Sequence, residues 1–137
     1  IINSNEYKDS EPEAVNEYYM TIFGTTFTDK NKLKRLNLLQ TKQQILSGKT
    51  IEDTLVKELY FKEGFTILPD LRKLTIPTLI IHGDNDHIPV ECALQIAESI
   101  EGSEFVVIEN CGRFAYIEKP DVVHREIDRF FALHPQS

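Results

Sequence analysis

Two short, continuous apolar runs constrain the fold more than any other feature of this sequence. Residues 76–81 have the sequence Ile-Pro-Thr-Leu-Ile-Ile, and residues 104–108 have the sequence Glu-Phe-Val-Val-Ile. Runs of this length are typical of strands that are buried on both faces of a sheet. Residues 90–100 lie between them with apolar side chains at helical spacing, and a last helix is expected from Pro120. This order predicts an α/β fold built on a parallel βαβα unit with a right-handed crossover.

The first half of the chain has helical periodicity in place of such runs. Capping patterns at 10–13 and 50–53 and apolar side chains three or four residues apart predict helices there. We expect three helices, each ended by a glycine, at residues 10–24, 28–48 and 50–64. Pro69 and the break at Gly64 mark the boundary. The expected organisation is a helical segment at 1–70 and an α/β segment at 71–137.

Length and charge exclude several classes of function. The 137 residues are 41% hydrophobic, which is enough for one core and too little for two independent enzyme domains. The formal net charge is −7, so nucleic acid would be repelled and is not an expected partner. The basic residues within 30–35 have acidic neighbours, and we interpret them as a solvated face. No apolar run approaches about 18 residues, so no membrane span or membrane partner is expected.

The two cysteines, Cys92 and Cys111, fit neither a disulfide framework nor a zinc site. A reducing cytoplasm is therefore the expected compartment. Cys111 precedes Gly112 in a predicted tight turn, and we expect it to be a small packed thiol. Neither thiol has neighbouring positive charges that would activate it, so a reactive role is not expected.

In a parallel sheet, ligands and catalytic groups gather beyond the carboxyl ends of the strands. Here those ends are followed by His82-Gly-Asp-Asn-Asp-His-Ile-Pro89 and by Glu109-Asn-Cys-Gly-Arg-Phe-Ala-Tyr-Ile-Glu-Lys-Pro120. With their strands, these segments resemble the C-terminal half of an α/β-hydrolase of the esterase and proline iminopeptidase kind. The resemblance implies that Asp86, in the Gly-x-x-Asp loop, is the catalytic acid. It also implies that position 113 is the site of the catalytic base and that residues 1–70 are a helical lid.

The sequence departs from the family pattern in two places. The nucleophile motif Gly-x-Ser-x-Gly is absent, since none of the six serines lies between two glycines at that spacing. Position 113 holds Arg where the family has His. A guanidinium stays protonated near neutral pH and cannot act as a general base. We therefore expect a fragment of a serine hydrolase for small-molecule esters or amides, without a cofactor and inactive alone.

Three alternatives remain open for the same residues. Metal binding is the first, because His82, Asp84, Asp86 and His87 offer four potential ligands within six residues, but their spacing is not that of an EF-hand loop. A non-catalytic binding module of the same fold is the second, and Arg113 favours it. A base relocated to one of the four histidines is the third; we interpret these as structural or solvated.

Two structural expectations follow from the resemblance. Acid and base must touch in the family, so Asp86 and Arg113 should form an ion pair within about 4 Å that is partly buried. Two parallel strands alone leave open edges, so the chain should self-associate by strand pairing or by lid exchange.

Overall fold

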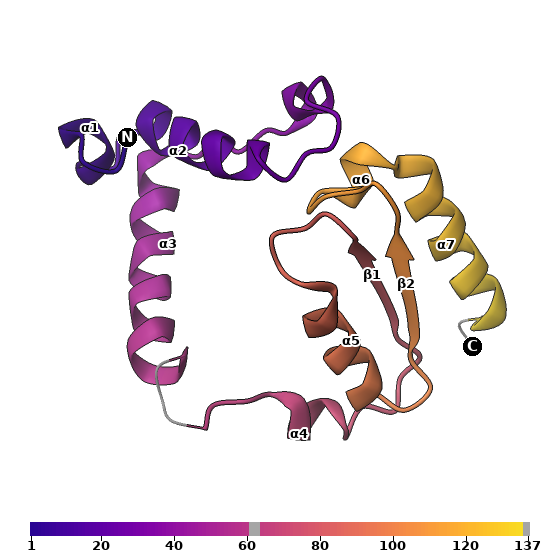
Figure 1. Cartoon of the computed structure of the whole chain (residues 1–137). Coiled ribbons are helices and arrows are strands. Elements are labelled where there is room, and N and C mark those ends of the chain that lie inside the picture. Colours follow the sequence, from indigo (N-terminus) through magenta and orange to yellow (C-terminus); the bar gives the residue numbers. More distant parts are fainter. Residues whose placement is uncertain (61–63, 136–137) are drawn as a thin grey trace. The chain divides into compact units, whose positions relative to one another are not determined.

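The computed structural model describes residues 1–60 and 64–135 as two compact units (Figure 1). The first unit consists of Ile1–Thr25 and Asn37–Thr66. The second consists of Thr26–Leu36 and the chain from Ile67 onward. The division therefore differs from a single boundary at residue 70, because 26–36 pack with the strand-containing part. Among the described residues, no helix combines the length and apolar character needed to cross a membrane.

The first unit is helical, as the periodicity predicts. Its elements are α1 (Asn5–Lys8), α2 (Pro12–Gly24), α3 (Lys42–Leu55) and a π-helical turn, η2 (Val56–Tyr60). Val15 of α2 and Ile45 of α3 are its buried apolar side chains. Around them lies a chain of aromatic contacts in which Tyr18 touches both Tyr7 and Tyr19.

The expected helices at 28–48 and 50–64 are wrong. A single helix, α3, runs through Gly48 and Thr50, and the expected end of the third helix at 61–63 lies outside the described residues. The reason is the capping box at Thr41: its side chain accepts from the Gln44 backbone amide, and the Gln44 side chain accepts from the Thr41 amide. Thr50 bonds its hydroxyl to the Leu46 carbonyl and so continues the helix instead of capping one.

The start of α2 also differs from the expected capping box at Ser10. The N-cap is Glu11, which makes no side-chain capping bond. Ser10 has a positive φ of 61° and is buried, and its hydroxyl oxygen accepts from the Lys49 ammonium of α3 at 2.8 Å. The contact with Lys49 therefore takes the hydroxyl away from the helix terminus. Gly24 is the last residue of α2 rather than a left-handed end.

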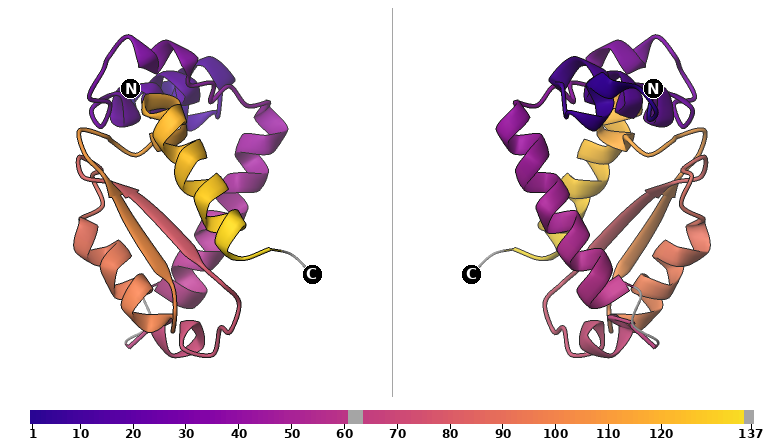
Figure 2. Two further views of the ribbon diagram at one scale, coloured as in Figure 1. Left: turned by 90° about the vertical axis from the view of Figure 1, so that its right-hand side faces the viewer. Right: turned by 90° about the vertical axis from the view of Figure 1, so that its left-hand side faces the viewer.

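The second unit contains the expected parallel βαβα arrangement. After the short helix α4 (Leu68–Leu71), its elements are β1 (Leu79–Gly83), α5 (Val90–Ser99), β2 (Glu104–Ile108), α6 (Ala115–Glu118) and α7 (Pro120–Leu133). The strands are parallel, with Leu79 opposite Glu104 and Gly83 opposite Ile108. Helices α5 and α7 cover opposite faces of the sheet (Figure 2). Residues 26–36 add a 3₁₀ turn, η1 (Lys32–Arg35).

The strands are less buried than their sequence predicts. Ile108 is buried at the end of β2, but most other strand residues keep intermediate exposure, and Val107 is exposed. The core lies between the sheet and α7, where Ile108, Cys111 and Val123 form a buried cluster. The sheet has only two strands in the described part of the chain, so their edges are not covered as in a larger parallel sheet.

Replacing Gly48 with Ala should stabilise the first unit. Gly48 lies inside α3, and a Cβ atom there would meet nothing within 4 Å. Alanine restricts the unfolded chain and favours the helix, so the free energy of unfolding should rise by about 0.5–1 kcal/mol in urea denaturation. Gly102→Ala is the matched control: at φ +74° it should destabilise. A fall in stability for Gly48→Ala would contradict the single continuous α3.

Candidate active site

The carboxyl ends of β1 and β2 lie at the same rim of the sheet, because the strands are parallel and in register (Figure 1). Two loops leave from this rim, one at residues 84–89 and the other at 109–114. These are the two segments in which the sequence places chemistry. The parallel pairing predicted from the apolar runs is therefore confirmed.

Backbone hydrogen bonds join the two loops directly. The Asp84 amide donates to the Ile108 carbonyl at 3.1 Å, and the Asn85 amide donates to the Cys111 carbonyl at 2.9 Å. Glycine is required at position 83, since a Cβ atom there would collide with the carbonyl oxygens of Cys111 and the residue after it. The first loop is thus held against the second by main-chain contacts.

The side chain of Asp84 adds a further bond between the loops. Its Oδ1 accepts from the Cys111 amide at 3.0 Å. This bond holds the pKa of Asp84 below its usual value, against a smaller opposing effect of burial. Cys111 itself is fully buried, and burial together with the negative charge of Glu118 raises its pKa to about 11. The expected packed thiol is confirmed, and it stays protonated at neutral pH.

Asp86 and Arg113 face each other across the loops, as expected. Arg113 Nη1 lies 3.5 Å from Asp86 Oδ1, and the Asp86 side chain is only 8% exposed. The same carboxylate oxygen accepts from the Ile88 amide at 3.2 Å, which folds the loop around the acid. The predicted ion pair is confirmed by this distance. Its carboxylate is oriented toward residue 113, where it would stabilise a positive charge.

A second side chain, an imidazole, lies on the same carboxylate. His87 Nδ1 is 2.9 Å from Asp86 Oδ1, and the His87 side chain is about half exposed, at 47%. The imidazole and the guanidinium therefore share one oxygen. An arginine cannot exchange protons near neutral pH, so this pair supplies charge and orientation at position 113 without a base.

Glu118 is a buried residue whose role the sequence analysis missed. It is 1% exposed, yet its carboxylate faces three donors. Oε1 accepts from the Gly112 amide at 2.8 Å, while Oε2 accepts from the Thr28 amide at 2.8 Å and the Thr28 hydroxyl at 2.7 Å. These bonds satisfy a carboxylate removed from water and tie residues 26–36 to the second loop.

Lys32 reinforces the same connection. Its ammonium donates to the main-chain carbonyl of Glu118 at 2.5 Å. The expectation that Lys32 belongs to a solvated face is therefore wrong. Lys34 and Arg35 are exposed, in agreement with the expectation for the remainder of the basic run. The cause is local. Lys32 lies in η1, which contacts α6, and the buried carboxylate of Glu118 favours a cation nearby.

The segment 26–28 touches the second loop through its backbone and an aromatic ring. Glycine is required at 112, because a Cβ atom there would collide with the Thr26 carbonyl. Phe27, 2% exposed, stacks on Phe114 with ring centroids 5.5 Å apart. The sequence signal for this contact is Glu118, which directly follows the apolar residues 114–117. A carboxylate in such a place is buried only where hydrogen-bond donors surround it.

The potential metal ligands of the first loop do not gather into a site. His82 Nε2 lies 2.9 Å from the Ile88 carbonyl, whereas Asp84 bonds the second loop and Asp86 faces Arg113. Across residues 1–60 and 64–135, no three His, Cys, Asp or Glu side chains are close enough to hold an ion. Of the four histidines, only His87 contacts the acid within the described part.

Comparisons with known proteins agree with this geometry. No family model matches the chain. A 2-hydroxy-6-oxo-6-(2'-aminophenyl)hexa-2,4-dienoic acid hydrolase of Metapseudomonas resinovorans is 40% identical over 52 residues, 37% of this chain and 18% of the relative. A proline iminopeptidase of Saccharolobus solfataricus is 35% identical over 76 residues, 53% of this chain and 24% of the relative. An α/β fold family hydrolase of Bacillus anthracis superposes with a TM-score of 0.66 at 16% identity, covering 94% of this chain and 44% of that one.

The chain is similar in sequence to parts of α/β-hydrolases, and its fold is similar to theirs. It spans about a fifth to a quarter of the length of these two relatives, 18% and 24%. The sequence resemblance places the acid of the family in the loop after β1 of this chain and the base in the loop after β2. The resemblance to the α/β-hydrolase fold is thus confirmed, whereas the roles of Asp86 and position 113 remain predictions.

Replacing Glu118 with Gln should destabilise the second unit. The amide keeps one acceptor oxygen but turns an NH₂ group toward a donor, so one buried amide or hydroxyl loses its partner. Such a loss costs about 1–3 kcal/mol in the free energy of unfolding, measured by denaturant titration. Glu101→Gln, at an exposed position, is the matched control and should change stability by less than about 0.5 kcal/mol. Equal effects of the two substitutions would contradict the buried connection.

Asp84 should contribute to the pH dependence of stability. Because its pKa is lower in the folded than in the unfolded chain, its stabilisation is present above its ordinary pKa of 3.8 and is lost as the pH falls through the folded value. In Asp84→Asn this acid step should be missing, so thermal unfolding of variant and wild type should differ less at low pH than at pH 7. Glu104 and Glu126, whose pKa values Arg129 lowers, act alike in both proteins and cancel in the comparison. A constant difference across the acid range would contradict the role of Asp84.

Proposed function

We propose that this chain is the acid-bearing part of a serine α/β-hydrolase that cleaves a small-molecule ester or amide through a serine acyl-enzyme. The observation that carries the proposal is the carboxylate of Asp86 facing residue 113 across the ends of two parallel strands, 3.5 Å from its side chain. The two relatives, a hydrolase of a dienoic acid and a proline iminopeptidase, are consistent with attack on a carbonyl carbon.

In this proposal, the geometry assigns each residue one task. A histidine at 113 would take the proton of the attacking serine, and Asp86 would orient the imidazole and stabilise its charged form. Gly83 and Gly112 let the two loops approach, and Glu118 fixes the turn that carries position 113. The nucleophile would come from a Gly-x-Ser-x-Gly motif, which this chain does not contain.

Two absences in the sequence support the proposal that the chain is inactive alone. Without the serine there is no attacking atom, and with Arg at 113 there is no base at the position that faces the acid. The chain is accordingly a fragment in this proposal, with a first unit that serves as part of the helical lid. Residues 26–36 belong to the second unit, where the Thr28 amide donates to Glu118.

A non-catalytic binding module is the second candidate, and Arg113 favours it. The Asp86–Arg113 ion pair fills the place of an acid–imidazole pair and holds the two loops together without proton transfer. A module of this kind would keep the pocket of the complete fold and lose turnover. The two candidates differ in whether the acid loop still supports catalysis once a base is restored.

Restoring the base in a complete fold tests the proposal. Residues 74–133 would replace the aligned segment of the Saccharolobus solfataricus proline iminopeptidase, once with Arg113 and once with Arg113→His. We expect the arginine chimera to be inactive and the histidine chimera to hydrolyse prolyl p-nitroanilide, with kcat higher by about 10²–10⁴-fold. The gain should disappear when Asp86→Asn is added to the histidine chimera.

Folding and the nucleophile are controlled separately. Circular dichroism and labelling with a fluorophosphonate report whether each chimera is folded and its serine accessible. In parallel, the unaltered chain should give no turnover of p-nitrophenyl acetate above the buffer rate. A folded histidine chimera without activity, or an arginine chimera as active as its histidine counterpart, would contradict the assignment of Asp86 and position 113.

A further inference from the structure

The peptide group between Cys111 and Gly112 is held at both of its polar atoms. Its carbonyl oxygen accepts from the Asn85 amide at 2.9 Å, and its N–H, which belongs to Gly112, donates to Glu118 Oε1 at 2.8 Å. A peptide group beside a glycine rotates easily, because glycine adopts φ values of either sign. Here a rotation would break both bonds and leave the buried Glu118 carboxylate without one of its donors. The backbone that leads into residue 113 is therefore fixed in one orientation.

Thr28 holds the Glu118 carboxylate in the place where it can bond this peptide. The Thr28 amide and hydroxyl donate to Glu118 Oε2 at 2.8 Å and 2.7 Å. The same hydroxyl lies 3.1 Å from the carbonyl oxygen of Asn110, which it can also donate to. A hydroxyl has a single proton, but both acceptors keep Thr28 beside the second loop. Thr28 is thus bonded to the loop directly and also through Glu118.

The two residues before Thr28 contact the chain on either side of residue 113. The Thr26 carbonyl packs against Gly112 so closely that a Cβ atom there would collide with it. The Phe27 ring stacks on Phe114 at 5.5 Å between centroids. Positions 112 and 114 are therefore both fixed from the segment 26–28, and they determine the direction in which the backbone projects the side chain between them.

That direction decides whether residue 113 meets the acid. Asp86 is fixed by its own loop, because its Oδ1 accepts from the Ile88 amide at 3.2 Å. The 3.5 Å distance between Arg113 Nη1 and Asp86 Oδ1 depends in addition on how the second loop presents position 113. An interaction between an acid and an opposite charge weakens with distance, so a turn of the Cys111–Gly112 peptide would reduce it.

We propose that Glu118 and Thr28 are positioning residues that direct the side chain of residue 113 toward Asp86. Glu118 does so by holding the Cys111–Gly112 peptide, and Thr28 does so by holding the Glu118 carboxylate. Both act through the main chain of the second loop. This inference rests on the proposed function, since it takes Asp86 and position 113 as the acid and the site of the base.

An imidazole introduced by Arg113→His measures this alignment in the full chain. A carboxylate nearby favours the charged imidazole, so NMR titration should give it a pKa about one pH unit or more above the ordinary value of a histidine. Adding Asp86→Asn should remove most of this increase. His87, which contacts the same carboxylate oxygen, is followed in the same spectra, so that the two titrations are assigned separately.

Two substitutions of Thr28 separate position from charge, since neither changes the charge of Glu118. In the Arg113→His chain, Thr28→Val removes the hydroxyl and keeps the shape, and it should lower the pKa of the introduced imidazole by about half a pH unit or more. Thr28→Ser keeps the hydroxyl and should leave that pKa unchanged. Glu118→Asp keeps the charge but is one methylene shorter, so it cannot reach the Gly112 amide and Thr28 together and should lower the pKa as well.

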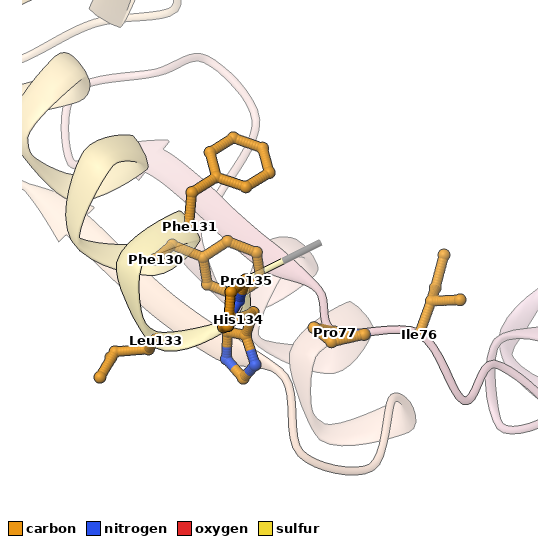
Figure 3. Close-up of a pocket in the computed structure, with 7 residues that line it drawn as sticks. All are labelled: Ile76, Pro77, Phe130, Phe131, Leu133, His134 and Pro135. Atoms are coloured by element: carbon orange, nitrogen blue, oxygen red, sulfur yellow. The ribbon is translucent and has the colours of Figure 1, made fainter. Parts of the chain in front are cut away.

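Leu133→Ala is the remote control. Leu133 lines a depression of about 650 Å³ together with Ile76, Pro77 and the end of α7 (Figure 3). Ile76 and Pro77 precede β1, whereas the two loops follow β1 and β2, so this depression lies at the opposite end of the strand from Asp86. The substitution should leave the pKa of the introduced imidazole unchanged.

The outcomes distinguish this inference from the proposed function. If Asp86→Asn lowers the pKa of the introduced imidazole but Thr28→Val does not, the inference is overturned and the proposed function stands. An effect of Glu118→Gln without an effect of Glu118→Asp shows that charge acts in place of position, and it overturns the inference too. If Asp86→Asn has no effect, the pairing that carries the proposed function fails, and this inference fails with it. Thr28 is exposed, so Thr28→Val should fold, as circular dichroism will verify, even if a Glu118 variant does not.

Discussion

The site depends on one close backbone approach, at the rim where β1 and β2 end. Gly83 has no Cβ atom, so the carbonyls of Cys111 and its neighbour can lie against it, and the amides of Asp84 and Asn85 can bond the second loop. Parallel pairing brings the loops to one rim, but this approach sets their spacing. The ion pair between Asp86 and Arg113 is a consequence, because both side chains leave from segments whose backbones are already fixed.

Glu118 extends the same constraint to a third segment. An ionised carboxylate is costly to bury unless donors replace its water, and the amides of Gly112 and Thr28 with the Thr28 hydroxyl do so. Removing the carboxylate would leave those donors unpaired, which is why a single buried side chain can hold residues 26–36 to the strand-containing unit. Residues 26–36, whose basic run the sequence places in a solvated helix, thus help to hold the second loop in position.

Elements that are marked by a periodic apolar pattern were predicted correctly from the sequence, whereas those that depend on one local polar pair were not. Apolar runs and helical spacing located β1, β2 and α7, since burial of a whole element leaves a periodic signal. The helices predicted at 28–48 and 50–64 are wrong because their ends were assigned to glycines. Gly48 lies inside α3, and a Cβ atom there would meet nothing within 4 Å. There the deciding signal was the capping box of Thr41 and Gln44, a local pair that the apolar pattern outweighed.

The sequence by itself determined that two strands run parallel and that position 113 carries no base, and it predicted that the chemistry lies in the loops after the strands. These properties depend on residue type and on spacing along the chain. Only the tertiary structure decided that Lys32 bonds the Glu118 carbonyl and that the Ser10 hydroxyl bonds Lys49 instead of capping a helix. The physical reason is that burial of a polar group is decided by partners distant in sequence, which no local pattern encodes.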